Sequence, residues 1–94
     1  MLTDRHMAAY KAFYESTINN EFLDSRTELL VGLAAAMAIN CIPCQRYYLD
    51  RAKAAGIAKG EISEVLAKVM AVAAGQKRLQ FEETCTRYNI AFEG

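Results

Sequence analysis

Two cysteines separated by two residues are the part of this chain best suited to covalent chemistry. Cys41 and Cys44 enclose Ile42 and Pro43, and the only other cysteine among the 94 residues is Cys85. Two thiols at this spacing can close a disulfide within one helical turn, so one can attack an oxidising substrate and the other can resolve the product. The pair therefore predicts reversible dithiol chemistry.

Pro43 predicts where the two thiols lie in the secondary structure. Proline disrupts the interior of a helix but suits its first turn, so a break is expected over residues 40–42, followed by a new helix. Cys41 then lies at the entrance of that helix and Cys44 in its first turn. The free amides and partial positive charge of a helix N-terminus favour the thiolate, which is the reactive form.

Tyr48 is a candidate partner of the thiols because it follows Cys44 by four residues, a spacing that stacks two side chains on one helix face. Its hydroxyl could donate a proton or a hydrogen bond near the sulfur, or Tyr48 could be a core tyrosine beside Tyr47. Arg46 and Arg51 could favour the thiolate if they fold towards it, although exposed helix arginines are normally solvated.

Glu28, the nearest acidic residue upstream of the pair, is a candidate base. It also completes the capping-box pattern Ser25-Arg26-Thr27-Glu28, in which Ser25 caps a helix and Glu28 reaches back. His6, the only histidine, is expected to be a surface or packing residue, and Cys85 a buried helix residue.

Two other interpretations of the cysteine pair stay open. Both cysteines could be small buried hydrophobic residues. The pair could also supply half of a zinc site, for which His6 and Cys85 are the only further soft ligands, at no familiar spacing. A thioredoxin domain is not indicated, because the sequence lacks the pattern of βαβ units.

The apolar pattern predicts an all-α fold, a single domain over residues 1–94 with about five helices. Hydrophobic residues make up 53% of the chain and proline occurs once, which favours a packed helical protein over disorder. The expected helices run from Asp4 to about Asn19, from about Arg26 through the apolar run Leu29–Ile39, from Pro43 to about Ala55 with Gly56 as its C-cap, from about Glu61 to Gly75, and from Gln76 to about Tyr88.

The charges exclude several classes of partner. Eleven basic and eleven acidic residues are interspersed and cancel, so neither nucleic acid nor a membrane surface is an expected partner. The longest apolar run is shorter than the roughly 20 residues of a membrane-spanning helix. The charged N-terminal segment does not resemble a secretory signal, so a cytoplasmic setting with reduced thiols is expected. No cofactor is predicted.

Several segments in a fixed order resemble the carboxymuconolactone decarboxylase and alkylhydroperoxidase D family over roughly residues 22–78. They are an apolar helix that begins Thr27-Glu28-Leu29-Leu30, the sequence Asn40-Cys41-Ile42-Pro43-Cys44, the segment Ala52-Lys53-Ala54-Ala55-Gly56, and Glu61-Ile62-Ser63-Glu64-Val65-Leu66 leading to Gly75. The resemblance implies a small helical bundle that assembles as homotrimers or homohexamers, with the thiols in a pocket near subunit contacts.

The peroxidase branch of this family implies roles for individual residues. Cys44 would attack a hydroperoxide, Cys41 would resolve it as a disulfide, and a dithiol reductant would restore the pair. This branch carries a histidine where the chain has Tyr48, and its glutamate aligns with Leu29 rather than Glu28. The sequence therefore predicts a peroxide-reducing thiol-disulfide oxidoreductase with Cys44, Cys41, Tyr48 and Glu28 as site residues. The alternative is a non-enzymatic oligomeric module that senses redox state or binds a ligand.

Overall fold

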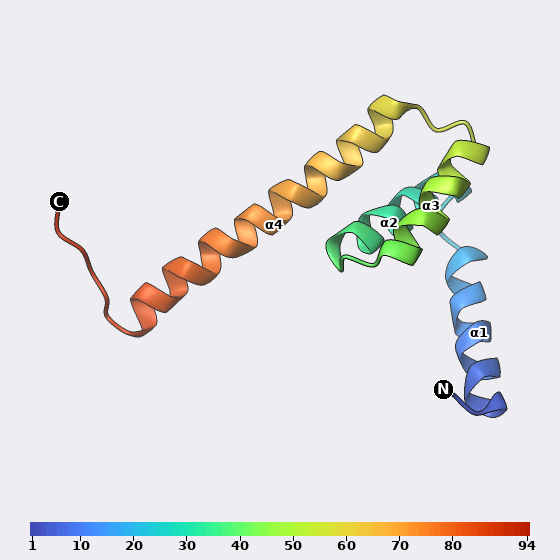
Figure 1. Ribbon diagram of the computed structural model, residues 1–94, viewed down its shortest axis with the longest axis horizontal. Helices are drawn as coiled ribbons and strands as arrows, with labels where there is room; N and C mark the ends of the chain where they lie inside the picture. Colours follow the sequence, from blue (N-terminus) through green and yellow to red (C-terminus); the bar gives the residue numbers. More distant parts are fainter.

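Four helices and no strand make up the computed structural model, which describes all residues from 1 to 94 (Figure 1). They are α1 (Asp4–Ile18), α2 (Ser25–Ala38), α3 (Ile42–Ala54) and α4 (Lys59–Arg87). The predicted all-α class is confirmed. The count of four is near the predicted number of about five, and the difference arises because α4 continues through Gly75 where the sequence analysis expects two helices. A single glycine in a helix interior costs only about 1 kcal/mol relative to alanine, which a long helix tolerates.

The first turn of α2 differs from the predicted capping box. The N-cap is Asp24, whose carboxylate accepts a hydrogen bond of 2.7 Å from the amide of Thr27. This hydrogen bond holds the pKa of Asp24 below its ordinary value. The prediction of Ser25 as the cap is therefore wrong by one residue, and the carboxylate of Glu28 has a different partner, which is described below.

Asn40 ends α2 and reverses the chain. Its φ of 58° places it in the left-handed region, which asparagine tolerates better than most residues. The amide of Cys41 donates to the carbonyl of Ala36 at 3.0 Å, and that of Asn40 donates to Met37 at 3.2 Å, as in a Schellman motif. The predicted break over residues 40–42 is confirmed. Gly56, with φ of 72°, follows the end of α3 in the same way, as expected.

The core lies between α2 and α3, which form an antiparallel hairpin. α2 contacts all three other helices, and its contact with α3 is the most extensive. Small residues at the interface allow the two helix backbones to approach closely. The buried hydrophobic residues are Leu29, Leu33 and Ala36 on α2 and Tyr48 and Ala52 on α3. Ile62 and Val65 on the first turns of α4 pack against this cluster.

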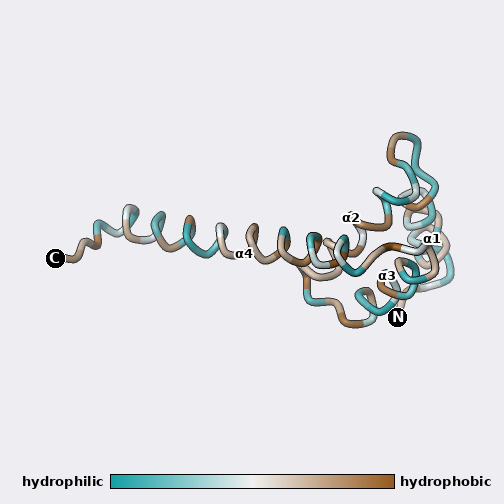
Figure 2. Tube along the Cα trace, turned by 90° about the horizontal axis from the view of Figure 1, so that it is seen from above, coloured by the Kyte–Doolittle hydropathy of each residue, from teal (hydrophilic) through white to brown (hydrophobic).

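Most of α4 lies away from this core. The helix leaves the hairpin and projects into solvent, and the two chain ends lie far apart (Figure 1). The radius of gyration is 18.5 Å, whereas a compact domain of this size has about 13 Å. Only 6 of 94 residues are buried. Apolar stretches recur along α4 and into the C-terminal segment (Figure 2), and its exposed side chains include Leu66, Met70, Val72, Leu79 and Phe81.

The chain therefore leaves much apolar surface uncovered. Val31 of the central helix α2 is also 55% exposed, although the sequence predicts burial almost all round this helix. None of the four helices combines the length and the apolar character that crossing a membrane requires.

Candidate thiol site

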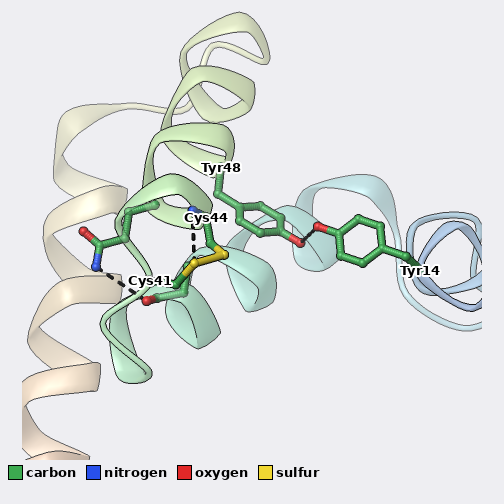
Figure 3. Close-up of a disulfide and its surroundings, with 6 residues drawn as sticks. Tyr14, Cys41, Cys44 and Tyr48 are labelled. Atoms are coloured by element: carbon green, nitrogen blue, oxygen red, sulfur yellow. Dashed lines mark hydrogen bonds between the residues drawn. A yellow bond between two sulfur atoms is a disulfide. The ribbon is translucent and has the colours of Figure 1, made fainter. Parts of the chain in front are cut away.

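Cys41 and Cys44 form a disulfide at the start of α3 (Figure 3). Cys41 is the N-cap of the helix, Pro43 occupies its first turn, and the Cα atoms of the two cysteines are 5.2 Å apart. Both cysteines are half-buried. The predicted placement of the pair at a helix N-terminus is confirmed, and the two sulfur atoms are close enough for reversible exchange.

The two sulfur atoms differ in their hydrogen bonding to the N-terminus of α3. The amide of Cys44 donates a hydrogen bond of 3.3 Å to Sγ of Cys41. An amide directed at this sulfur stabilises negative charge on it. A reductant thiolate is therefore expected to attack Sγ of Cys44 and to release Cys41 as the stabilised thiolate. The side chain of Gln45 secures this turn by donating to the carbonyl of Ala36 at 3.5 Å.

Tyr48 lies one helical turn after Cys44, and only 9% of its surface is exposed. Its hydroxyl forms a hydrogen bond of 2.9 Å with the hydroxyl of Tyr14 on α1, as Figure 3 shows. The ring of Tyr47 contacts the Tyr48 ring edge-on, with centroids 5.0 Å apart. The structure thus brings Tyr48 to the side of the disulfide and directs its hydroxyl to Tyr14 rather than to a sulfur atom.

Burial raises the pKa of Tyr48 above its ordinary value of 10.0, and the hydrogen bond with Tyr14 and the charge of Glu28 act in the same direction. A raised pKa means that folding favours the neutral phenol, so this stabilisation is complete below pH 10 and is lost as the pH rises further. We expect the guanidinium unfolding midpoint to fall more steeply between about pH 10 and pH 12 in the parent than in Tyr48→Phe. Tyr10→Phe, which removes an exposed hydroxyl of α1, should follow the parent. Equal slopes in the parent and Tyr48→Phe would contradict the assignment.

Gly32 on α2 makes room for the Tyr48 ring. A Cβ atom at this position would lie only 2.9 Å from Cδ1 of Tyr48 and closer still to two other ring atoms. Alanine normally stabilises a helix relative to glycine, but here it would have to displace a packed aromatic ring. The close approach of α2 to this ring depends on a residue without a side chain.

Gly32→Ala is expected to lower the free energy of unfolding by about 1–2 kcal/mol, because overpacking outweighs the gain in helix propensity. Gly75→Ala is the matched control, since no atom lies within 4 Å of the Cβ position there, and it should raise stability by about 1 kcal/mol. Denaturant unfolding of both variants measures the difference. Stabilisation by both substitutions would mean that the Tyr48 ring does not require this space.

Glu28 pairs with Arg51 at the other end of the hairpin from the disulfide. Its carboxylate is 7% exposed and accepts hydrogen bonds of 2.7 Å and 3.4 Å from the guanidinium. These bonds raise the pKa of Arg51. The guanidinium also lies 5.5 Å and 5.6 Å from the ring centroids of Tyr47 and Tyr48. Eight residues of α2, about 12 Å of helix axis, separate Glu28 from Ala36 beside the cysteines.

The remaining candidates lie apart from the pair. His6 on α1 has Arg5 as its hydrogen-bond neighbour, and Cys85 lies on the projecting part of α4. Arg46 is exposed and pairs weakly with Asp50 at 4.0 Å. No cluster of three or more His, Cys, Asp or Glu side chains is arranged to bind a metal ion.

A hollow of about 520 Å³ lies near Glu28 and includes neither cysteine. Its lining residues are Ser25, Arg26, Leu29, Arg51, Ala54, Ala55 and Ile57.

Sequence reasoning does not identify Tyr14 and Gly32 as site residues. Tyr14 belongs to the apolar pattern of α1, and that periodicity says which face of a helix is buried but not which residue it meets. Gly32 lies inside an alanine-rich run with no local signal of a ring packed against it. Tyr14 and Gly32 can be recognised as site residues only from the contacts between helices.

The fold and the disulfide define a helical protein with a Cys-x-x-Cys pair at the N-terminus of one helix of an antiparallel hairpin. The sequence profile of the carboxymuconolactone decarboxylase family matches residues 4–81, so the chain belongs to this family. The matched region is longer than the predicted core of residues 22–78, since it includes α1.

A solved structure from Methanobacterium thermoautotrophicum, a structural genomics target, has the same fold. It is 27% identical to the chain, with a TM-score of 0.82, and the similarity covers 87% of this chain and 94% of that one. No protein with curated annotation matches the chain.

Proposed function

We propose that this protein is a thiol-disulfide oxidoreductase that reduces hydroperoxides, as the alkylhydroperoxidase D-like branch of its family does. The observation that carries the proposal is the disulfide between Cys41 and Cys44 at the start of α3, with the amide of Cys44 directed at the sulfur of Cys41. Cys44, the proposed attacking residue, lies in the first turn of α3, where the free amides and partial positive charge of the helix N-terminus favour the thiolate that peroxide reduction requires. The amide bound to Cys41 supports the resolving thiolate. Membership of the family supports the same class of reaction.

The proposed oxidation has two steps. The thiolate of Cys44 attacks one oxygen of the hydroperoxide, the O–O bond breaks, and the product alkoxide takes up a proton to become an alcohol while Cys44 becomes a sulfenic acid. The thiolate of Cys41 then attacks the sulfur of Cys44, and the sulfenic oxygen leaves as water after protonation. Two electrons pass from the thiol pair to the peroxide, and a disulfide remains.

A dithiol reductant closes the proposed cycle. One of its thiolates attacks Sγ of Cys44 and releases Cys41 as a thiolate, and its second thiol resolves the mixed disulfide. Tyr48 is proposed to donate a hydrogen bond in the oxidative half of the cycle, and Glu28 is retained as a candidate base. A cytoplasmic setting belongs to this proposal, because the pair must be reduced again after each turnover.

We also propose that the protein works as a homotrimer or homohexamer. The extended shape, the exposed apolar side chains of α4 and the small number of buried residues support association of several copies. Light scattering coupled to size exclusion is expected to give a mass of three or six times 10.5 kDa. A monomeric mass at micromolar concentration would contradict this part of the proposal.

The first test of the function is peroxide-dependent oxidation of a dithiol donor by the purified protein. Dithiothreitol and dihydrolipoamide serve as donors, hydrogen peroxide and cumene hydroperoxide serve as oxidants, and mass spectrometry locates the disulfide. Donor turnover together with a Cys41–Cys44 disulfide is the expected result. Cys85→Ser is the control, since a cysteine outside the pair should be dispensable.

A second candidate function is redox sensing without efficient turnover. Two observations favour it: the carboxylate of Glu28 is bound to Arg51, and Tyr48 stands where the peroxidase branch has histidine. Tyrosine stays neutral at pH 7, whereas histidine titrates near that pH and can relay protons. A disulfide that forms with peroxide while the donor is not consumed would favour this alternative.

A further inference from the structure

The outer face of α2, formed by Val31, Ala35 and Ala38, is apolar and uncovered. The three residues recur at spacings of four and three, so they share one side of the helix. All three are exposed, Val31 to 55%, whereas Leu33 on the other side is fully buried. Residues 29–45 carry no charge. This face therefore has no charged side chain that would favour contact with water.

α4 also has an apolar face that no part of its own chain covers. Val65 packs against the core, and Met70 follows it by five residues, which is about 140° round the helix. Met70, Ala74 and Phe81 lie at spacings of four and seven and form the outer face of α4. Met70 is 62% exposed and Phe81 68%. The segment 69–76, at the centre of this face, carries no charge.

The two outer faces cannot cover each other within one chain. α4 packs against the buried side of α2, around Leu33, and then projects beyond the hairpin (Figure 1). The helices before α4 end at Ala54, so a similarity over 87% of the chain to the solved structure must include much of α4. Because the TM-score is high, that protein holds the helix in a similar direction. The projection is thus a feature of the fold, and both faces need a partner from outside the chain.

The chemistry of the two outer faces matches. Ala35 and Ala38 leave a shallow surface on α2, and the longer side chains of Met70 and Phe81 can fill the grooves of such a surface. Contact between two uncharged surfaces leaves no ion unpaired. Two parallel α4 helices would instead bring the cations at 77 and 78 of each copy together. The uncharged outer face of α2 is the better partner for α4.

We propose that the outer face of α4 in one copy of the chain packs on the outer face of α2 in a second copy. This inference rests on the proposed assembly into homotrimers or homohexamers and identifies the surfaces that form it. Two different faces meet, so each copy contributes one of each kind, and such contacts can close a ring. Because α2 leads directly to Cys41, the contact lies on the helix that precedes the thiol pair.

The experiment changes one face at a time and measures mass by light scattering coupled to size exclusion. Val31→Glu alters the outer face of α2, and Met70→Glu alters that of α4. Phe22→Glu is the matched control, since Phe22 is 92% exposed and belongs to neither face. All three positions are exposed in the chain, so the fold should be retained, which circular dichroism checks.

Val31→Glu and Met70→Glu are each expected to raise the dissociation constant roughly a hundredfold or more, because an unpaired carboxylate would be buried in the contact. Both should elute with a smaller mass than the parent, and Phe22→Glu should keep the parent mass. A parent-like mass for either of the first two, or an equal loss in Phe22→Glu, would overturn the proposal. A loss in Val31→Glu alone would indicate pairing of two α2 helices, and a loss in Met70→Glu alone pairing of two α4 helices.

Mixing the two variants gives a second and independent test. A Val31→Glu copy keeps an intact α4, and a Met70→Glu copy keeps an intact α2, so the mixture regains one proper contact. It should form a species larger than either variant alone. A mixture that stays dissociated would overturn the proposal, since pairing of like helices regains no contact.

The same measurements separate this inference from the proposed function. A parent of monomeric mass would contradict the proposed assembly and this inference together. An oligomeric parent whose variants keep its mass would contradict only the inference. Peroxide-dependent donor turnover by the parent is decided by the separate assay and does not depend on either result.

Discussion

Cys44→Ser is expected to abolish peroxide-dependent oxidation of a dithiol donor, with the remaining rate equal to that of a blank without protein. A serine hydroxyl is not ionised at neutral pH and does not attack a peroxide oxygen, so the first bond of the cycle cannot form. This is the largest effect expected for any single substitution in the chain. Donor turnover that persists in Cys44→Ser would remove Cys44 as the attacking residue.

Cys41→Ser is expected to stop the same cycle one step later. Cys44 can still be oxidised once, but no thiol lies close enough to close the disulfide that the parent forms across 5.2 Å between Cα atoms. The sulfenic acid should then accumulate, and dimedone should label it at Cys44 in mass spectra. Labelling of Cys41 in Cys44→Ser, together with no labelling of Cys44 in Cys41→Ser, would mean that Cys41 attacks the peroxide and Cys44 resolves the sulfenic acid.

The cysteine variants also test which sulfur atom of the disulfide the reductant attacks. The amide of Cys44 donates to the sulfur of Cys41, which makes Cys41 the better leaving group when a thiolate attacks the disulfide. Cys41→Ser should therefore form a lasting mixed disulfide with thionitrobenzoate at Cys44. Cys85→Ser controls for reaction outside the pair and should behave as the parent.

Local chemistry explains which parts of this site could be predicted from the sequence. Pro43 and Asn40 fix the break between α2 and α3 through their own backbone preferences, so the position of Cys41 at a helix start follows from neighbouring residues. Gly56 ends α3 for a similar reason. These features depend on a few adjacent residues, and such signals can be read without knowing the tertiary structure.

Features that depend on contacts between helices could not be predicted. The capping-box pattern assigns Glu28 to the backbone at the start of α2, but a guanidinium opposite it on α3 is a stronger partner for a buried carboxylate than an exposed amide. The hydrogen bond between Tyr14 and Tyr48 joins residues 34 positions apart. The direction of α4 is likewise not encoded in its apolar pattern, because exposed apolar residues there have no partner within the chain.

Arg51→Met is expected to lower the free energy of unfolding by about 2–3 kcal/mol, the largest effect on stability predicted for any substitution in the chain. The substitution keeps a long apolar side chain and removes both hydrogen bonds to the carboxylate of Glu28, which is 7% exposed. A buried carboxylate without a donor loses its hydration and gains nothing in return. Arg51 is itself 27% exposed at its side chain, so the loss should fall below that of a fully buried pair.

Arg46→Met is the matched control for this substitution. Arg46 lies on the same helix and also faces a carboxylate, but its side chain is 86% exposed and 4.0 Å from that of Asp50. Exposed pairs of this kind contribute little, so stability should change by less than about 0.5 kcal/mol. Chemical denaturation of both variants, with the disulfide intact, measures the difference. Equal losses would mean that the pair of Glu28 with Arg51 behaves as a surface ion pair.

Glu28→Gln then separates a structural role of the pair from a catalytic one. The amide oxygen of glutamine can still accept from Arg51, so most of the stability lost in Arg51→Met should be retained. If Glu28 only holds the hairpin together, the rate of disulfide formation with peroxide stays at the parent value. If Glu28 is the base of the cycle, that rate falls while the protein remains folded, since glutamine cannot take up a proton. The stability of Arg51→Met and the rate of Glu28→Gln together assign the carboxylate to one role or the other.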